Sequence, residues 1–438
     1  MASNGWDTLP LDEAVQVNPT VPLQRGEAYP FVDMQAVDPA SRSVGPSEMR
    51  PFTGGGSRFI AGDTLMARIT PCLENGKIAR FAPNGDQQMA HGSTEFIVIR
   101  GKPGVTDNDF AYYLTKWDGV RLYCISQMTG TSGRQRVPTD SLSHCEVTIP
   151  PLKEQEAIAC ILGTLDDKIE LNRRMSQTLE QMARAIFKAW FVDFLPVRAK
   201  MERRWQRGQS LPGLPAHLYD LFPARLVPSE LGEIPDGWEV ASLPELIDLN
   251  PPRPLRKREV APYLDMANMP TRGHVPDEVV ERAFGSGMRF MNGDTLVARI
   301  TPCLENGKTA FVDFLQDGQI GWGSTEYIVL RPKPPVPEEF AYCLARSDEF
   351  REFAIQSMTG SSGRQRVQAD SLTHFHLPLF PKSVAEAFGR AIKPLFTRSS
   401  SAVHESRTLA ALRDALLPKL ISGELRVPNA ERIVGRAV

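Results

Sequence analysis

The chain is poor in cysteine, lacks long apolar runs and carries almost no excess of charge. It has six cysteines in 438 residues and no Cys-x-x-Cys pair, which excludes a disulfide framework and a zinc site of that spacing. No run reaches the roughly 18 apolar residues that a membrane span needs. The start, MASNGWDTLPLDEAV, has no secretory signal pattern. We therefore expect reduced thiols, no membrane segment and a cytoplasmic location.

The charge balance and the missing phosphate loop exclude further classes. The net charge of −2 is unlike that of a general polyanion binder, which usually carries a basic excess. If the chain binds DNA, a few well-placed arginines and lysines must do so. No G-x-x-x-x-G-K-[ST] loop occurs, which excludes a motor ATPase of that type. The hydrophobic fraction of 42% is that of an ordinary globular protein.

The strongest signal in the sequence is internal repetition. Residues 62–77, GDTLMARITPCLENGK, return at 293–308 as GDTLVARITPCLENGK, with fifteen of sixteen positions identical at an offset of 231. GSTEFIVIR and QMTGTSGRQRV likewise return as GSTEYIVLR and SMTGSSGRQRV. This period is far above the 20–50 residues of a solenoid. The chain therefore contains two copies of a large unit.

Each copy begins with a part rich in glycine, proline and short β-type runs. Residues 95–99 and 326–330 are strand candidates, and Asn75-Gly76 is a turn signal between such runs. Residues 110–123 and 340–353 predict short amphipathic helices. We therefore expect a β-rich mixed domain at the start of each copy.

Each copy ends in a helical part. Apolar residues recur every three or four positions from residue 153 to residue 190, and again after residue 382. A capping box at Thr164 and Asp167, and Pro394 at a first helical position, predict a short helix followed by a long one. A single stripe of apolar residues at this spacing indicates a buried helix. Two matching stripes in one chain favour two helices that pack on each other as an antiparallel pair.

These features predict an α+β fold with an internal pseudo-two-fold repeat, in which a long antiparallel helical pair separates two β-rich mixed domains. The expected segments are 1–150 (first β-rich domain), 151–194 (central helical region), 195–234 (linker), 235–381 (second β-rich domain), 382–427 (distal helical region) and 428–438 (flexible tail).

Three segments resemble a known family. Residues 150–200, PPLKEQEAIACILGTLDDKIELNRRMSQTLEQMARAIFKAWFVDFLPVRAK, resemble the central conserved region of type I restriction–modification specificity (S) subunits. LRDALLPKLISGELRV at 412–427 resembles their distal conserved region, and ELGEIPDGW at 230–238 resembles the start of a second target-recognition domain. The resemblance covers nearly the whole chain.

The resemblance implies a non-catalytic subunit that reads double-stranded DNA. Two target-recognition domains would each read half of a split sequence. The helical regions would form a coiled-coil spacer and dock two methyltransferase (M) subunits, which restriction (R) subunits join. S-adenosylmethionine, ATP and Mg would be bound by those partners, with no cofactor in this chain. The residues themselves leave open a duplicated hydrolase using Asp63, Glu74 and Glu95, or an interaction scaffold that does not bind DNA.

The candidate DNA contacts lie in loops that recur nearly unchanged in both β-rich domains. Arginine and glutamine suit base edges, whereas serine, threonine and lysine suit phosphate oxygens. For a single arginine, pairing with a carboxylate such as Glu74 or Glu95 is the alternative. The candidates are Arg68, Thr70, Asn75, Lys77, Ser93, Thr94, Thr129, Ser132, Arg134, Gln135, Arg136, Arg299, Thr301, Asn306, Lys308, Ser324, Thr325, Thr359, Ser362, Arg364, Gln365 and Arg366.

Two catalytic motifs are present only in part. Asn250-Pro251-Pro252-Arg253 has an arginine where the motif of adenine methyltransferases has an aromatic residue that stacks on the flipped base. A metal-dependent nuclease needs an acid and a lysine two residues apart on a strand, whereas Glu74 and Lys77 are three apart across a turn. We therefore predict no catalytic residue and no metal site in this chain.

Overall fold

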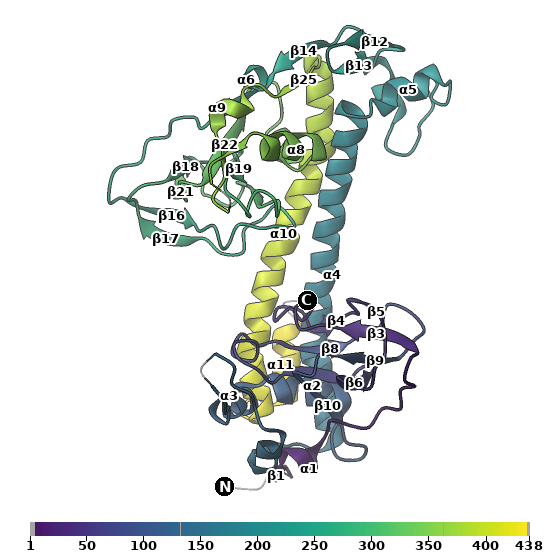
Figure 1. Cartoon of the computed structure of the whole chain (residues 1–438), viewed down its shortest axis with the longest axis vertical. Coiled ribbons are helices and arrows are strands. Elements are labelled where there is room, and N and C mark those ends of the chain that lie inside the picture. Colours follow the sequence, from purple (N-terminus) through teal and green to yellow (C-terminus); the bar gives the residue numbers. More distant parts are fainter. Residues whose placement is uncertain (1–4, 132, 362, 436–438) are drawn as a thin grey trace. The chain divides into compact units, whose positions relative to one another are not determined.

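The computed structural model describes residues 5–131, 133–361 and 363–435 (Figure 1). The chain divides into two compact units. Unit 1 combines Met1–Leu171 with Glu405–Val438, and unit 2 is the continuous segment Asn172–His404. Each unit holds the β-rich domain of one copy together with segments of both helical parts, so the duplication found in the sequence corresponds to two folded bodies.

Unit 1 is built around a five-stranded sheet of order β2-β10-β7-β8-β4 and a four-stranded sheet of order β5-β3-β9-β6, and β1 pairs with β11. The strands are β1 (Asp7–Pro10), β2 (Val15–Val17), β3 (Ala28–Val32), β4 (Ser43–Val44), β5 (Glu48–Pro51), β6 (Ser57–Ile60), β7 (Thr64–Ala67), β8 (Ile78–Phe81), β9 (Met89–Gly92), β10 (Phe96–Gly101) and β11 (Glu146–Ile149). The helices outside the long pair are α1 (Leu11–Ala14), α2 (Asn108–Lys116), α3 (Asp118–Ser126), η1 (Thr139–His144) and α11 (Val427–Val434).

Unit 2 repeats this plan with sheets of order β15-β22-β19-β20 and β17-β16-β21-β18 and with three two-stranded pairs, β12–β13, β14–β25 and β23–β24. The strands are β12 (Leu226–Ser229), β13 (Gly232–Pro235), β14 (Glu239–Ser242), β15 (Ile247–Leu249), β16 (Val260–Leu264), β17 (Val280–Ala283), β18 (Met288–Phe290), β19 (Thr295–Ala298), β20 (Thr309–Phe311), β21 (Gly321–Gly323), β22 (Tyr327–Pro332), β23 (Met358–Thr359), β24 (Arg366–Val367) and β25 (His376–Leu379). The shorter helices are α5 (Leu195–Met201), η2 (Ala216–Leu221), α6 (Leu243–Leu246), α7 (Glu339–Ala345), α8 (Asp348–Gln356) and α9 (Ala369–Leu372).

The predicted strands at 95–99 and 326–330 are confirmed as β10 and β22, and each lies between two neighbouring strands of its sheet. The predicted helices at 110–123 and 340–353 are each two helices instead of one. Trp117 has extended backbone angles and separates α2 from α3. Ser347 separates α7 from α8, and its side chain accepts a hydrogen bond from the amide of Phe350 as a helix cap.

Two helices of 40 residues, α4 (Leu152–Phe191) and α10 (Lys382–Ile421), supply a segment to each unit. Within each unit the two segments are antiparallel, because residue numbers rise along α4 as they fall along α10. The packed side chains in unit 1 are Ile158, Leu162, Leu165, Leu409 and Leu416. Those in unit 2 are Ala183, Phe187, Trp190, Phe388 and Ile392. The predicted antiparallel pairing is therefore confirmed.

The expected break between a short and a long helix is wrong for both α4 and α10, which continue through it. The hydroxyl of Thr164 donates to the carbonyl of Cys160 at 2.8 Å, as in a helix interior rather than a cap. Pro394 lies inside α10, where a proline costs about 3 kcal/mol. Ile392 and Phe396 on either side are buried, and each such side chain contributes roughly 1.5–3 kcal/mol. Packing therefore outweighs the local signals.

The expected linker, 195–234, is ordered against its own chain. It contains α5, η2 and the β12–β13 hairpin. Trp205 is buried and donates its indole N–H to the carbonyl of Gln209 at 2.8 Å. Leu218 and Phe222 belong to the same buried cluster as Trp190 of α4. Five prolines in this segment predicted a linker, but its aromatic residues fold back onto the long helix.

The expected flexible tail, 428–438, contains most of α11. Ala430 and Val434 are buried in the core cluster of unit 1. The prediction is therefore wrong as far as residue 434, because Val427, Ala430 and Val434 recur at helical spacing and pack on the core.

Candidate nucleic-acid interface

Three of the predicted loops meet in unit 1. The amide of Thr70 donates to the carbonyl of Gln135 at 3.0 Å, and the amide of Gln135 donates to the Thr70 hydroxyl at 3.1 Å. The amide of Arg68 donates to the carbonyl of Glu95 at 2.9 Å. Three segments that are separate in the sequence therefore form one surface patch, which we call the loop cluster.

Unit 2 builds the same loop cluster from the second copy. The amide of Thr301 donates to the carbonyl of Gln365 at 3.0 Å, and the amide of Arg299 donates to the carbonyl of Glu326 at 2.9 Å. Ile300 and Arg366 form an isolated β-bridge, as do Ile69 and Arg136 in unit 1. The repeated motifs are thus repeated in three dimensions.

One arginine of each loop cluster is paired with a carboxylate. The guanidinium of Arg136 contacts both oxygens of Glu95 at 2.7–3.0 Å. Arg366 contacts both oxygens of Glu326 at 2.8–2.9 Å. Hydrogen bonding to these carboxylates raises the pKa of Arg136 and of Arg366. For Arg136 and Arg366, the structure therefore shows the carboxylate pairing that the sequence left open as the alternative to DNA contact.

Three further cations donate to backbone carbonyls, and a fourth donates to a side-chain oxygen. The ammonium of Lys77 donates to the carbonyl of Met34 at 2.7 Å, and that of Lys308 donates to the carbonyl of Met266 at 2.5 Å. Arg68 donates to the carbonyl of Val137 at 2.7 Å, and Arg299 donates to the side chain of Gln368. These contacts position the loops and use part of each cation's donor capacity.

The remaining candidates face solvent or serve the backbone. Ser93 and Ser324 accept a hydrogen bond from the amide of Glu95 and Glu326, respectively. Ser132 and Ser362 lie outside the described residues. The exposed candidates are Asn75, Thr94, Thr129, Arg134, Asn306, Thr325, Thr359 and Arg364. Arg134 and Arg364 are therefore the loop-cluster arginines best placed to meet a ligand.

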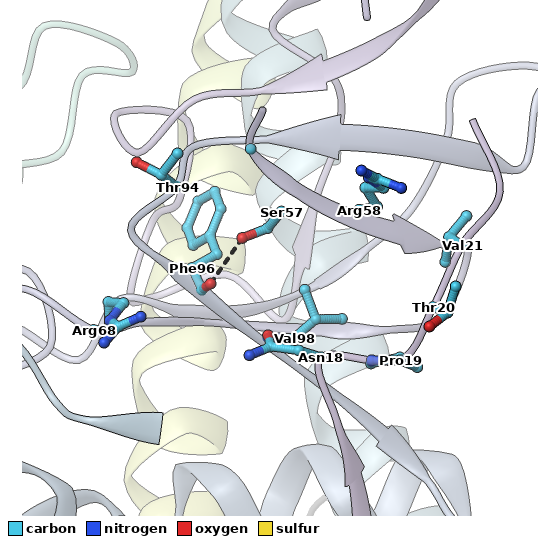
Figure 2. Close-up of a pocket in the computed structure, with 11 residues that line it drawn as sticks. Asn18, Pro19, Thr20, Val21, Ser57, Arg58, Arg68, Thr94, Phe96 and Val98 are labelled. Carbon is cyan, nitrogen blue, oxygen red and sulfur yellow. Dashed lines mark hydrogen bonds between the residues drawn. The ribbon is translucent and has the colours of Figure 1, made fainter. Parts of the chain in front are cut away.

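A hollow of about 380 Å³ opens beside the loop cluster of unit 1 (Figure 2). Arg68 and Thr94 line it, together with Asn18 and Arg58. A second hollow, of about 670 Å³, shares Thr94 and contains Arg50 in its wall. Sequence reasoning missed Arg50 and Arg58. The repeat offset could have identified them, since Arg282 and Arg289 occupy the matching places in the second copy.

The carboxylates of the hydrolase alternative have structural partners. Asp63 is buried, and Arg100 donates to both of its oxygens at 2.6 and 2.7 Å. Glu95 is paired with Arg136, as described above. Glu74 is exposed on the turn. Within the described ranges, no group of three histidine, cysteine or acidic side chains could hold a metal ion.

The Asn-Pro-Pro-Arg motif also has a structural role. Asn250 has φ of 50°, and its side-chain oxygen accepts the amide of Val329 at 2.9 Å. Asn18 does the same for Val98 in the other copy. Arg253 donates to Asp294 at 2.7 Å. Burial raises the pKa of Asp294, although the arginine opposes the shift.

The fold and this interface define the class: a duplicated α+β protein whose two β-rich domains each present one loop cluster and pack on segments of a long helix pair. Across the described ranges, no helix is both long and apolar enough for a bilayer span. Residues 62–181 match the family model of the type I restriction modification DNA specificity domain.

Known proteins agree with this class. The chain is 24% identical over 420 residues to the type I restriction enzyme HindI specificity subunit of Haemophilus influenzae, which covers 86% of this chain and 90% of that protein. It is 25% identical over 345 residues to the type I restriction enzyme MjaIX specificity subunit of Methanocaldococcus jannaschii. This match covers 76% of this chain and 72% of that protein. The solved S subunit of a type I restriction–modification system from M. genitalium has the same fold, with a TM-score of 0.53 and 15% sequence identity. The match covers 96% of this chain and 97% of that chain. The chain is thus similar, over most of its length, to type I restriction–modification specificity subunits.

Proposed function

We propose that this chain is the DNA-reading subunit of a type I restriction–modification complex and recognises a target in two parts. The observation that carries the proposal is the duplication of the loop cluster, with an exposed arginine (Arg134 or Arg364) in each copy. Each β-rich domain then reads one half of the target, and the helix pair sets the gap between the halves. Arginine is the side chain that most often reads a guanine edge.

The same proposal assigns the chemistry to partner chains. Two M subunits dock on the helical regions and methylate adenine, and R subunits add restriction. S-adenosylmethionine, ATP and Mg are bound by those partners, and this chain binds none of them and is not catalytic. The assembly works in the cytoplasm. The net charge of −2 leaves the partners to supply much of the contact with phosphates.

The test is to isolate the tagged chain from its host and identify the subunits that co-purify. The complex is then offered a randomised duplex library, and the selected sequences are read. We expect M subunits in the complex and a split motif with a gap of constant length. Selection of no motif would contradict DNA reading, and substrate turnover by the purified chain alone would favour the hydrolase.

A further inference from the structure

Sheet β5-β3-β9-β6 of unit 1 and the matching sheet β17-β16-β21-β18 of unit 2 each carry, on one face, a row of four side chains from neighbouring strands. We call this the cross-strand row. In unit 1 the paired positions run across β5, β3, β9 and β6 as Glu48, Phe31, His91 and Arg58. In unit 2 they run across β17, β16, β21 and β18 as Val280, Tyr263, Trp322 and Arg289. The arrangement is repeated, and only the terminal arginine is identical.

A second arginine covers the aromatic member of each row. Arg50 lies two residues after Glu48 and therefore faces the same side of the sheet. Its guanidinium carbon is 3.6 Å from the centre of the Phe31 ring. In unit 2, Arg282 lies 4.7 Å from the centre of the Tyr263 ring. Stacking of this kind holds the guanidinium plane in one orientation while its edge stays available for an acceptor.

The buried ring of each row fixes the strand that carries the covering arginine. Nε2 of His91 bonds the carbonyl of Arg50 at 3.1 Å. The indole N–H of Trp322 donates to the carbonyl of Arg282 at 3.2 Å. His91 and Trp322 are buried. Different ring types thus provide the same support in the two copies, so what the repeat retains is the placement of the arginine.

The two covering arginines differ in their charge partners. Arg50 forms an ion pair with Glu48, and both side chains are about half exposed, at 49% and 51%. At the position of Glu48, unit 2 has Val280, which is exposed and cannot pair. In the part of the chain that the structure describes, Arg282 has no ion pair with a carboxylate. The positive charge is therefore neutralised locally in unit 1 and available in unit 2.

The surroundings of the row in unit 1 suit a nucleic-acid backbone. The hollow of about 670 Å³ is lined by Arg50, Phe31 and His91, together with Ser93 and Thr94 of the candidate loops. A guanidinium beside hydroxyl groups is the usual set of contacts for phosphate oxygens and base edges. The cross-strand row is therefore continuous with the surface that the loop motifs predict.

We propose that the covering arginines of the cross-strand rows contact the DNA, and that Arg282 contributes more than Arg50 because Glu48 neutralises Arg50 whereas Val280 offers Arg282 no carboxylate. This inference rests on the proposed function and adds a second contact surface to each domain. It also makes the two domains unequal in their dependence on salt, although their loop clusters are nearly identical.

The proposal is tested by substituting Glu48 and Val280, the residues that face the two rings, and the covering arginines themselves. Each variant is purified as the complex with its partner subunits. Binding to a duplex that carries the motif selected from the randomised library is measured over a range of salt concentrations. Arg282→Ala and Val280→Glu should each weaken binding about tenfold, equivalent to about 1.4 kcal/mol. Each should also lower the slope of log affinity against log salt by about one. Glu48→Val should strengthen binding and steepen the slope, and Arg50→Ala should have the smaller effect.

Matched variants separate charge from folding. Val280→Gln has the size of the glutamate variant without its charge and should bind like the unchanged protein. Arg207→Ala removes an exposed cation of the 195–234 segment and should have no effect. The inference would be overturned if Val280→Glu bound as tightly as the unchanged complex. It would also be overturned if Val280→Glu and Val280→Gln lost the same affinity. Neither result would contradict the proposed function. Absence of sequence preference in the unchanged complex would instead refute the function.

Discussion

Asp166 of α4 and Arg413 of α10 form a buried ion pair in unit 1, with Oδ1 and Nη1 2.6 Å apart. The second oxygen of Asp166 accepts the hydroxyl of Tyr113 at 2.7 Å. One carboxylate therefore joins the first β-rich domain to both long helices. Burial raises the pKa of Tyr113, and the charge of Asp166 adds to the shift, so the phenol remains a donor.

Breaking this pair should destabilise unit 1. We expect Arg413→Leu to cost roughly 3–5 kcal/mol, because it leaves the Asp166 carboxylate buried without its charge partner. Tyr113→Phe removes only one hydrogen bond and should cost roughly 1–3 kcal/mol. Thermal unfolding of the full chain measures both. An Arg413→Leu transition no lower than that of Tyr113→Phe would show that the pair is not important for stability.

Arg134 and Arg136 of the loop cluster in unit 1 should respond differently to substitution. Arg134→Ala should weaken DNA binding by roughly 1–3 kcal/mol for a lost base contact and relax specificity in one half-site, without changing the melting temperature. Arg136→Ala should also loosen the loop, since Glu95 loses its partner. Binding and unfolding are measured on the same complexes. Equal changes in binding and in unfolding for the two variants would contradict the different roles of Arg134 and Arg136.

The similarity of the two domains predicts similar half-sites. Across the aligned segments the differences are few and include Met66/Val297, Ile78/Thr309, His91/Trp322, Phe96/Tyr327, Ile99/Leu330, Gln127/Ser357 and Thr131/Ser361. If the domains bind in opposed orientation, the target should be close to an inverted repeat around a gap of fixed length. Methylome sequencing of the host gives the motif directly. Two unrelated half-sites would contradict the prediction.

The helix pair should act as a ruler. Ser176 and Ser399 meet across α4 and α10 with their hydroxyl oxygens 2.6 Å apart. Seven residues inserted after Ser176 and seven before Ser399 add two turns while keeping the seam in register. That lengthens the pair by roughly 10 Å, or about three base pairs at roughly 3.4 Å each. An unchanged gap in the selected motif would argue against a ruler. Insertion in α4 alone is the control and should disrupt the pairing.

Partner subunits should strengthen binding to DNA. Because the chain has a net charge of −2, we expect it to bind a target duplex weakly when alone. Adding the M subunits should raise the affinity and steepen its salt dependence, since phosphate contacts release counterions. Titrations with and without M at several salt concentrations measure this. An equal salt slope in both cases would place the phosphate contacts on this chain.

Much of the architecture could be predicted because it depends on patterns that survive duplication. The offset near 231 identified the two copies, and the spacing of residues such as Leu162 and Leu165 identified the helix pair. The breaks expected at Thr164 and Pro394 were wrong, because local signals report helix propensity and not the tertiary packing that overrides it. The order in 195–234 was missed for a related reason: Trp205 becomes buried only through contacts distant in sequence.

The site was predictable in part. The motifs correctly identified loops that meet in space, such as those of Thr70 and Gln135. Their spacing could not tell which arginine would pair with Glu95, since that depends on the geometry of the turn. The cross-strand rows were not found because their residues come singly from four strands and form no motif. Glu48 and Val280 become comparable only once the strand register is known.

Unit 1 combines segments that precede and follow unit 2 in the sequence, and this sets an order on biosynthesis. The ring of Trp6 lies close to Gly423, and Arg426 forms an ion pair with Glu154. The ribosome makes most of the first domain before unit 2, yet Leu416 and Ala430 of its core emerge only after unit 2. The nascent first domain must therefore wait, with its apolar surface uncovered, through the synthesis of all of unit 2.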